Sequence, residues 1–202
     1  MLSTGLDAER LDRYRGTMDS PRFLTGQFLL AMPGIGDPRF ERAVIAICAH
    51  DENGALGVGV GAIIEGLGLH DVLDQFKIDR GAAPNRPVHF GGPVETTRGF
   101  VIHSTDWGGQ DTIDVAGRWA LTGTIDILKA IAEGRGPAQW IVALGYAGWD
   151  GGQLDGEMQR HGWFCTPGDL ATLYDQTADR WADSFTQAGI DPRLLSPQAG
   201  TA

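Results

Sequence analysis

The sequence predicts an α+β fold built on a mainly antiparallel sheet. Most of the short apolar runs are joined by tight turns of glycine, proline, asparagine or aspartate. The clear helical patterns come late in the chain, so the order is not the strand–helix alternation of a parallel sheet. No repeat or linker divides the 202 residues, a length that suits one domain.

The first predicted strands cover residues 23–32, 43–49 and 56–64, which are apolar runs bounded by turn residues. Asn53-Gly54 lies between the second and third runs and predicts a β-hairpin, because both residue types tolerate positive φ. The spacing of apolar residues in 70–78 predicts a helix. Shorter strands are predicted in three further stretches, namely 88–90, 100–104 and 114–121.

The last third begins with a helix that Thr124 can cap, with Ile125, Leu128 and Ile131 at helical spacing. Residues 139–146 form the most apolar strand of the chain. A corner is predicted at Gly148-Trp149. The elements predicted after it are a helix from Asp150 to about His161 with a capping-box-like Gln153, a strand over 163–166, a helix from Pro167 through Leu170, Leu173 and Tyr174, and an amphipathic helix over 177–188.

Residues 22–192 are predicted to form the single domain, with a flexible N-terminal arm at 1–21 and a tail at 193–202. The formal net charge is -10, from 16 basic and 26 acidic residues. Because nucleic-acid and anionic-membrane binding both depend on basic surface, neither partner is expected.

The two cysteines, Cys48 and Cys165, lie within apolar runs, which is typical of reduced, buried thiols rather than a disulfide framework. The N-terminus has no apolar signal-peptide core, and no apolar run reaches the ~20 residues that span a membrane. We therefore expect a cytoplasmic protein. No metal-ligand spacing joins the five histidines, so neither a metal nor a cofactor is expected.

Two glycine-rich stretches invite a ligand-binding interpretation. In the run Gly57 to Gly61 the spacing is G-x-G-x-G, which differs from a dinucleotide loop, so close backbone packing is expected. The turn at Gly91-Gly92 could present backbone N–H groups to an anion, with His89 nearby.

A hydrolase triad of His103, Ser104 and Asp106 is not expected, because adjacent strand residues point to opposite faces. Gln153, Glu157 and Arg160 share one helical face. Two alternatives remain for Glu157: a buried, chemically useful carboxylate under Trp149, or part of a solvated face.

Five motifs occur in a recognisable order, and together they resemble the AlgH/YqgE family of bacterial proteins over about residues 22–192. They are A-M-P-G-I-G-D-P-R-F (31–40), H-D-E-N-G-A-L-G (50–57), F-G-G-P-V (90–94), R-G-F-V-I-H-S (98–104) and A-L-G-Y-A-G-W-D-G-G-Q-L-D-G-E-M (143–158). The resemblance implies a cytoplasmic α+β protein whose bent, largely antiparallel sheet approaches a pseudo-barrel flanked by helices. It implies no particular reaction, and its link to transcriptional regulation is an association through one member's name.

The chain departs from this family at two places. Gly61, Ala62 and Ile63 stand where relatives often carry an Asn-Lys/Arg-Pro turn, and Cys165 stands where relatives usually carry other small residues. A polar surface at the first place is therefore not expected, and neither is a catalytic cysteine at the second.

The leading hypothesis is a non-catalytic binding or regulatory protein whose partner is a protein or a small ligand. The alternative is an enzyme or nucleotide-binding protein with a pocket near Gly91-Gly92, His103 and Trp149. A third, a transcriptional regulator, is disfavoured as a direct DNA binder by the charge. The candidate ligand-contacting residues are His89, Gly91, Gly92, His103, Trp149, Gln153 and Glu157.

Overall fold

A computed structural model describes residues 23–176 and 179–195. Its strands are β1 (Gln27–Ala31), β2 (Val44–Asp51), β3 (Gly54–Gly59), β4 (Ile63–Gly68), β5 (Pro87–Phe90), β6 (Val94–His103), β7 (Ile113–Val115), β8 (Trp119–Thr122), β9 (Trp140–Asp150) and β10 (Trp163–Pro167). Its helices are α2 (Leu69–Gln75), α3 (Ile125–Ala132), α4 (Gln153–Gln159), α5 (Leu170–Tyr174) and α6 (Arg180–Gln187), with 3-10 turns η1 (Pro38–Phe40) and η2 (Pro192–Leu194).

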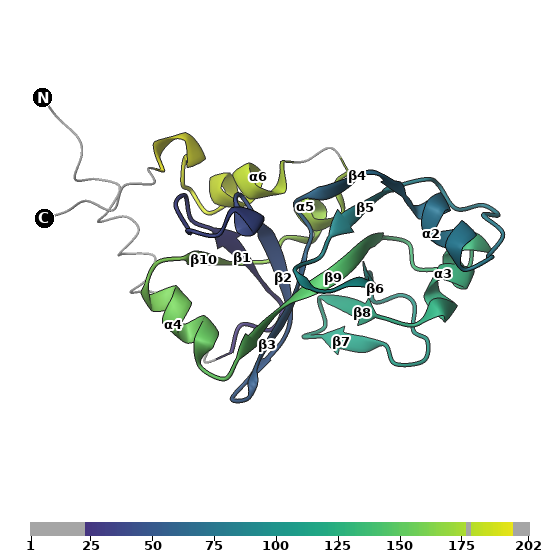
Figure 1. Cartoon of the computed structure of the whole chain (residues 1–202), viewed down its shortest axis with the longest axis horizontal. Coiled ribbons are helices and arrows are strands. Elements are labelled where there is room, and N and C mark those ends of the chain that lie inside the picture. Colours follow the sequence, from purple (N-terminus) through teal and green to yellow (C-terminus); the bar gives the residue numbers. More distant parts are fainter. Residues whose placement is uncertain (1–22, 177–178, 196–202) are drawn as a thin grey trace, which may run out of the picture.

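The strands form one curled sheet in the order β10-β1-β2-β3-β9-β6-β8-β7, and β4 joins it through β5. Every pair is antiparallel except β5 with β9. The sheet curls into a half-barrel, so the predicted α+β fold with a bent, mainly antiparallel sheet is confirmed. In Figure 1, β9 crosses the middle, with β1–β3, β10 and α4 on one side and β4–β8, α2 and α3 on the other.

β9 is the spine of the sheet because its two halves pair with different strands. Its last residues pair with β3, where Trp149 faces Ala55, and its first residues pair with β6, where Trp140 faces His103. The predicted corner at Gly148-Trp149 is therefore wrong: pairing with β3 keeps the strand extended through Asp150.

Three apolar clusters hold the layers together. The inner cluster fills the curl of the sheet with residues such as Phe28, Trp119 and Phe185, and α6 closes it. A second cluster joins α2 and α3 to β5, β6 and β9, and a third joins α4 to β1, β2 and β9.

Glycines allow three segments of backbone to cross at close range. A Cβ at Gly59 would lie 2.4 Å from the Phe90 carbonyl oxygen, and one at Gly91 would lie 2.1 Å from the Gly145 oxygen. A Cβ at Gly57 would lie 2.4 Å from the side chain of Ile45. The close-packing interpretation of the Gly57 to Gly61 run is thus confirmed, and no nucleotide loop is needed to explain it.

Several predicted boundaries move. The predicted strand over 56–64 is two strands, because β3 ends at Gly59, whose N–H donates to the Gly91 oxygen at 2.7 Å. The β2–β3 hairpin is confirmed, but of the predicted pair only Gly54 has positive φ. Gly152, not Asp150, occupies the N-cap of α4, and α5 is capped by Asp169 after a strand that includes Pro167.

The predicted arm at 1–21 lies outside the described residues, as does the predicted tail from 196 onward. At the end of the described chain, Pro192–Leu194 form η2, whose N-cap is Asp191. Within 23–176 and 179–195, no helix is both long enough and apolar enough to span a membrane.

Candidate functional site

The Gly91-Gly92 turn is occupied by the sheet itself. The N–H of Gly91 donates to the Leu144 oxygen at 2.8 Å, and its carbonyl accepts from Gly59. Both glycines are buried, and a cavity of about 30 Å³ beside them is lined by residues including Arg39 and Ala62. A cavity of this size holds about one water molecule. The Gly91 N–H that an anion would need is therefore already used.

His89 is a buried, neutral side chain on β5. It is 2% exposed, and burial, with a smaller contribution from the charge of Arg180, lowers its pKa from 6.5 to about 4. Arg180 is itself buried and donates to the carbonyl oxygens of Val60, Leu173 and Asp175. His89 thus belongs to the interior between β5 and the inner cluster.

The depressed pKa of His89 predicts acid destabilisation. Above pH 6.5 the imidazole is neutral in both states, so its contribution to stability is fully present there. As the pH falls from 6.5 to 4, the unfolded chain binds a proton that the folded chain does not, which removes about 3 kcal/mol. Unfolding free energies of the wild type and His89→Leu across this range measure it. Equal slopes in the two proteins would contradict the assignment.

His103 is fully buried on β6 and its hydrogen bonds fix its tautomer. Nδ1 lies 2.8 Å from the Ser104 carbonyl oxygen, which only accepts, so Nδ1 carries the proton. Burial lowers the pKa of His103, so the ring is neutral and Nε2 accepts from the Thr122 hydroxyl at 2.9 Å. The Ser104 hydroxyl instead donates to Asp106 at 2.5 Å. The triad is not assembled, as the alternation of strand faces predicted.

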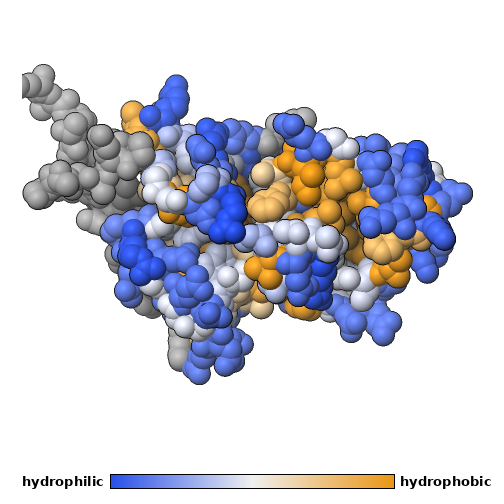
Figure 2. All heavy atoms as spheres, viewed as in Figure 1, coloured by the Kyte–Doolittle hydropathy of each residue, from blue (hydrophilic) through white to orange (hydrophobic). Residues whose placement is uncertain are grey.

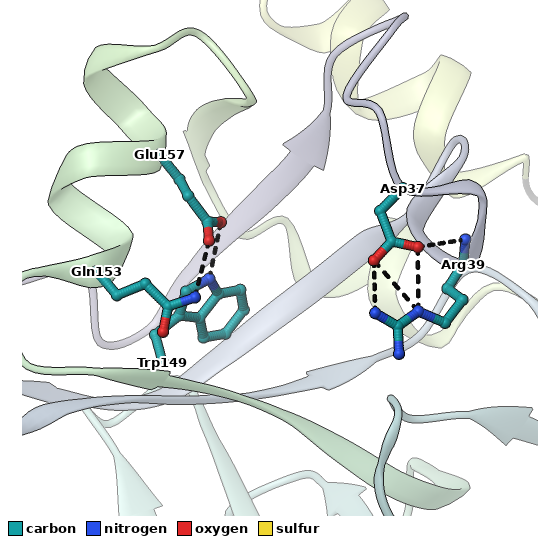
Figure 3. Close-up of polar contacts among 5 residues, drawn as sticks. All are labelled: Asp37, Arg39, Trp149, Gln153 and Glu157. Carbon is teal, nitrogen blue, oxygen red and sulfur yellow. Dashed lines mark hydrogen bonds and ion pairs between the residues drawn. The ribbon is translucent and has the colours of Figure 1, made fainter.

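Trp149, Gln153 and Glu157 do come together. The carboxylate of Glu157 accepts from the Trp149 indole at 3.0 Å and from the Trp163 indole at 2.8 Å, both through Oε2. Its Oε1 accepts from Gln153 at 3.0 Å (Figure 3). Glu157 is half-buried, which lies between the two alternatives that the sequence left open. The carboxylate joins α4 to β9 and β10.

Asp37 and Arg39 flank this cluster, and sequence reasoning did not select them. Asp37 caps η1 and holds the Arg39 guanidinium at 2.6 Å, and these hydrogen bonds lower the pKa of the Asp37 carboxyl (Figure 3). The next residue, Phe40, packs edge-on against Trp163 with ring centroids 5.5 Å apart. Asp37-Pro38 could have indicated this turn, because aspartate before proline is a helix-start signal.

The predicted pocket near Gly91-Gly92, His103 and Trp149 is not formed as one site. His103 faces Trp140 at the start of β9, and Trp149 lies nine residues further along the strand. At about 3.3 Å per residue, an extended strand separates them by roughly 30 Å. Gly92 lies between them, against Tyr146. The alternative function therefore loses its shared pocket.

Burial also argues against a cysteine nucleophile. It raises the pKa of both the Cys48 and the Cys165 thiol to about 12, so the reactive thiolate is scarce at neutral pH. The Cys165 thiol donates to the Gln27 side chain at 2.8 Å. Among the residues that the structure describes, no group of three potential metal ligands comes together.

The largest apolar hollow of those described lies between α2 and α3, and we name it the α2–α3 groove. Its volume is about 290 Å³, close to the lower end of the range for small-ligand pockets. It is lined by Leu67, Val72, Gln75, Phe76, Thr96, Thr97, Gly99, Phe100, Val101, Thr122, Gly123, Thr124, Ile125, Leu128, Val142 and Leu144. Hydrophobic atoms also gather on the face shown in Figure 2, over the region of β5, β6 and β9.

The α2–α3 groove has an uncharged lining and two exposed apolar side chains. None of its described lining residues is charged, although 21% of the chain is. Phe76 is 51% exposed and Ile125 is 40% exposed. Sequence reasoning missed the groove because its walls come from β4, α2, β6, α3 and β9, and the only sequence signal was an apolar residue at the end of each helix pattern.

A curled antiparallel sheet with its helices on the outside, glycine crossings at its spine and an uncharged groove define the class of α+β protein to which this chain belongs. A family model described as AlgH-like matches residues 28–193. The chain belongs to the AlgH-like family, and the resemblance seen in the motifs is confirmed.

Similar proteins span nearly the same length. A UPF0301 protein from Rhizorhabdus wittichii is 60% identical, covering 92% of this chain and 100% of its own. One from Sphingopyxis alaskensis is 56% identical, covering 91% of this chain and 98% of its own. The solution structure of AlgH from Pseudomonas aeruginosa is 38% identical, with a TM-score of 0.71 over 92% of this chain and 100% of that one. None of these names states a reaction.

Proposed function

We propose that this protein acts by binding, without catalysis, and that the α2–α3 groove takes an uncharged, largely apolar ligand. The observation that carries the proposal is the lining: apolar side chains and threonines, no charged residue, and Phe76 and Ile125 exposed beside the opening. Exposed apolar residues that gather at a concave surface are typical of binding sites.

The charge pattern selects the ligand. Burying an ionised group without a partner costs several kcal/mol, and the described lining offers no counter-ion. A nucleotide, whose phosphates are ionised, therefore suits this groove poorly. Gln75, Thr96 and Thr97 supply neutral hydrogen-bonding groups, which suit a carbonyl, hydroxyl or amide.

The non-catalytic part of the proposal rests on the state of the reactive groups. The Thr122 hydroxyl in the groove donates to His103, accepts from Thr112 at 2.8 Å and is fully buried. The carboxylate of Glu157 holds two indoles, and both thiols are protonated. We also propose a cytoplasmic location, supported by the two free thiols, and any regulatory role would act through the bound partner rather than through DNA.

Substitutions beside the opening are expected to weaken binding of a neutral apolar probe. Phe76→Ser and Ile125→Ser each remove apolar contact, which corresponds to about tenfold weaker binding of N-phenylnaphthylamine. Ile113→Ser is the matched control, because Ile113 is 52% exposed on β7, outside the groove. Fluorescence titration measures the dissociation constants, and anilinonaphthalene sulfonate serves as the charged comparison.

The outcome separates the proposal from non-specific adhesion. The wild type and Ile113→Ser should bind the neutral probe equally and more tightly than the sulfonate. Equal affinity in all four proteins, or preference for the sulfonate, would contradict the proposal.

A further inference from the structure

The α2–α3 groove runs along an edge of β6 rather than over one face of the sheet. Phe100 belongs to the inner apolar cluster and Val101 to the outer one, and both line the groove. Neighbouring residues of a strand point to opposite faces, so a hollow that touches both lies against the edge of the strand.

This edge is not covered by the next strand. β8 pairs with β6 only through Val101, Ile102 and His103, and at Thr122 the chain leaves the sheet to form α3. Among the described residues, the pairing thus assigns no strand to that side of the first part of β6, from Val94 to Phe100.

The same part of β6 also leaves its other neighbour. The register with β9 passes from Val94 opposite Tyr146 to Gly99 opposite Leu144, which leaves the stretch from Glu95 to Arg98 without a β9 partner in the register. Thr96 and Thr97 of this bulge are exposed and line the groove. Backbone N–H and C=O groups at such an edge are a template for another chain.

We propose that the occupant of the α2–α3 groove is an extended, uncharged segment of another protein, added as a strand to the edge of β6 and flanked by basic residues. The inference rests on the proposed function and names its ligand. Alternate side chains of the added strand enter the apolar lining, and the others face the solvent.

Charge decides the flanks of that segment. The chain carries a net charge of -10, and α2 beside the groove contains Asp71 and Asp74 but neither lysine nor arginine. An uncharged centre matches the lining, and basic ends match the acidic surroundings.

Fluorescence anisotropy with short labelled peptides tests the proposal on the full-length protein. The parent peptide alternates valine and threonine between pairs of terminal lysines. One comparison peptide carries N-methyl groups on alternate backbone nitrogens, and the other has terminal glutamates. We expect the N-methylated peptide to bind about tenfold more weakly, because the strand hydrogen bonds are lost. The glutamate-ended peptide should also bind more weakly, and more so at low salt.

Two variants and one probe complete the design. Phe76→Ser should weaken binding of the parent peptide, and Ile113→Ser should leave it unchanged. Equal binding of the parent and N-methylated peptides, or no peptide binding while N-phenylnaphthylamine still binds in the groove, overturns strand addition and leaves the proposed function standing. If neither peptide nor probe distinguishes Phe76→Ser from Ile113→Ser, both proposals fail.

Discussion

Gly92→Ala is expected to destabilise the protein by about 4 kcal/mol or more, or to prevent folding. A Cβ at this position would lie 2.2 Å from the carbonyl carbon of Tyr146 and 2.5 Å from the nitrogen of Ala147. Backbone is the obstacle, and β9 cannot yield because β3 and β6 pair with it on both sides. Its φ of +151° adds strain for any side chain.

Gly117→Ala supplies the control for this substitution. Gly117 also has positive φ, at +68°, but nothing lies within 4 Å of a Cβ placed there, so only about 1 kcal/mol of conformational strain is expected. Denaturant unfolding of both variants gives the comparison. A stable Gly92→Ala protein that lost ligand binding would show instead that the turn is a ligand contact.

Glu157→Ala is expected to lower the free energy of unfolding by about 3 kcal/mol. The substitution leaves the indole N–H groups of Trp149 and Trp163 without their acceptor, and both side chains are buried, at 7% and 4% exposure. Glu157→Gln keeps one oxygen that can accept from the indoles, so a smaller loss is expected. Denaturant unfolding followed by tryptophan fluorescence measures both effects.

The matched control for Glu157 is Asp155→Ala, since Asp155 is an exposed carboxylate on the same helix. A loss within about 0.5 kcal/mol is expected there. If Glu157→Ala were as stable as Asp155→Ala yet bound the neutral probe differently, Glu157 would be a ligand contact and its structural role would be secondary.

Local patterns in the sequence were sufficient for most elements of the fold. The β2–β3 hairpin was predicted because Asn53-Gly54 separates two apolar runs, and α3 was predicted because its apolar residues recur at helical spacing. The errors arose where a distant strand decided the outcome. β9 continues through Gly148 because β3 pairs with it, and no local pattern encodes that pairing.

The candidate site could be predicted only in part, for the same reason. Trp149, Gln153 and Glu157 were grouped correctly because they lie within one short stretch of chain. Gly91 and Gly92 were selected as ligand contacts, yet a glycine also permits close approach of another backbone, and only the register with β9 distinguishes the two. The α2–α3 groove, with walls from five elements, required the three-dimensional structure.

The most direct test of the binding proposal is a heteronuclear NMR titration of the nitrogen-labelled protein with N-phenylnaphthylamine. The proposal predicts saturable shifts of backbone amides that line the α2–α3 groove, including those of Phe76, Thr97 and Ile125, with Gln153 and Glu157 unmoved. Shifts centred on Gly92, Trp149 and Glu157, with the groove residues unmoved, would contradict it.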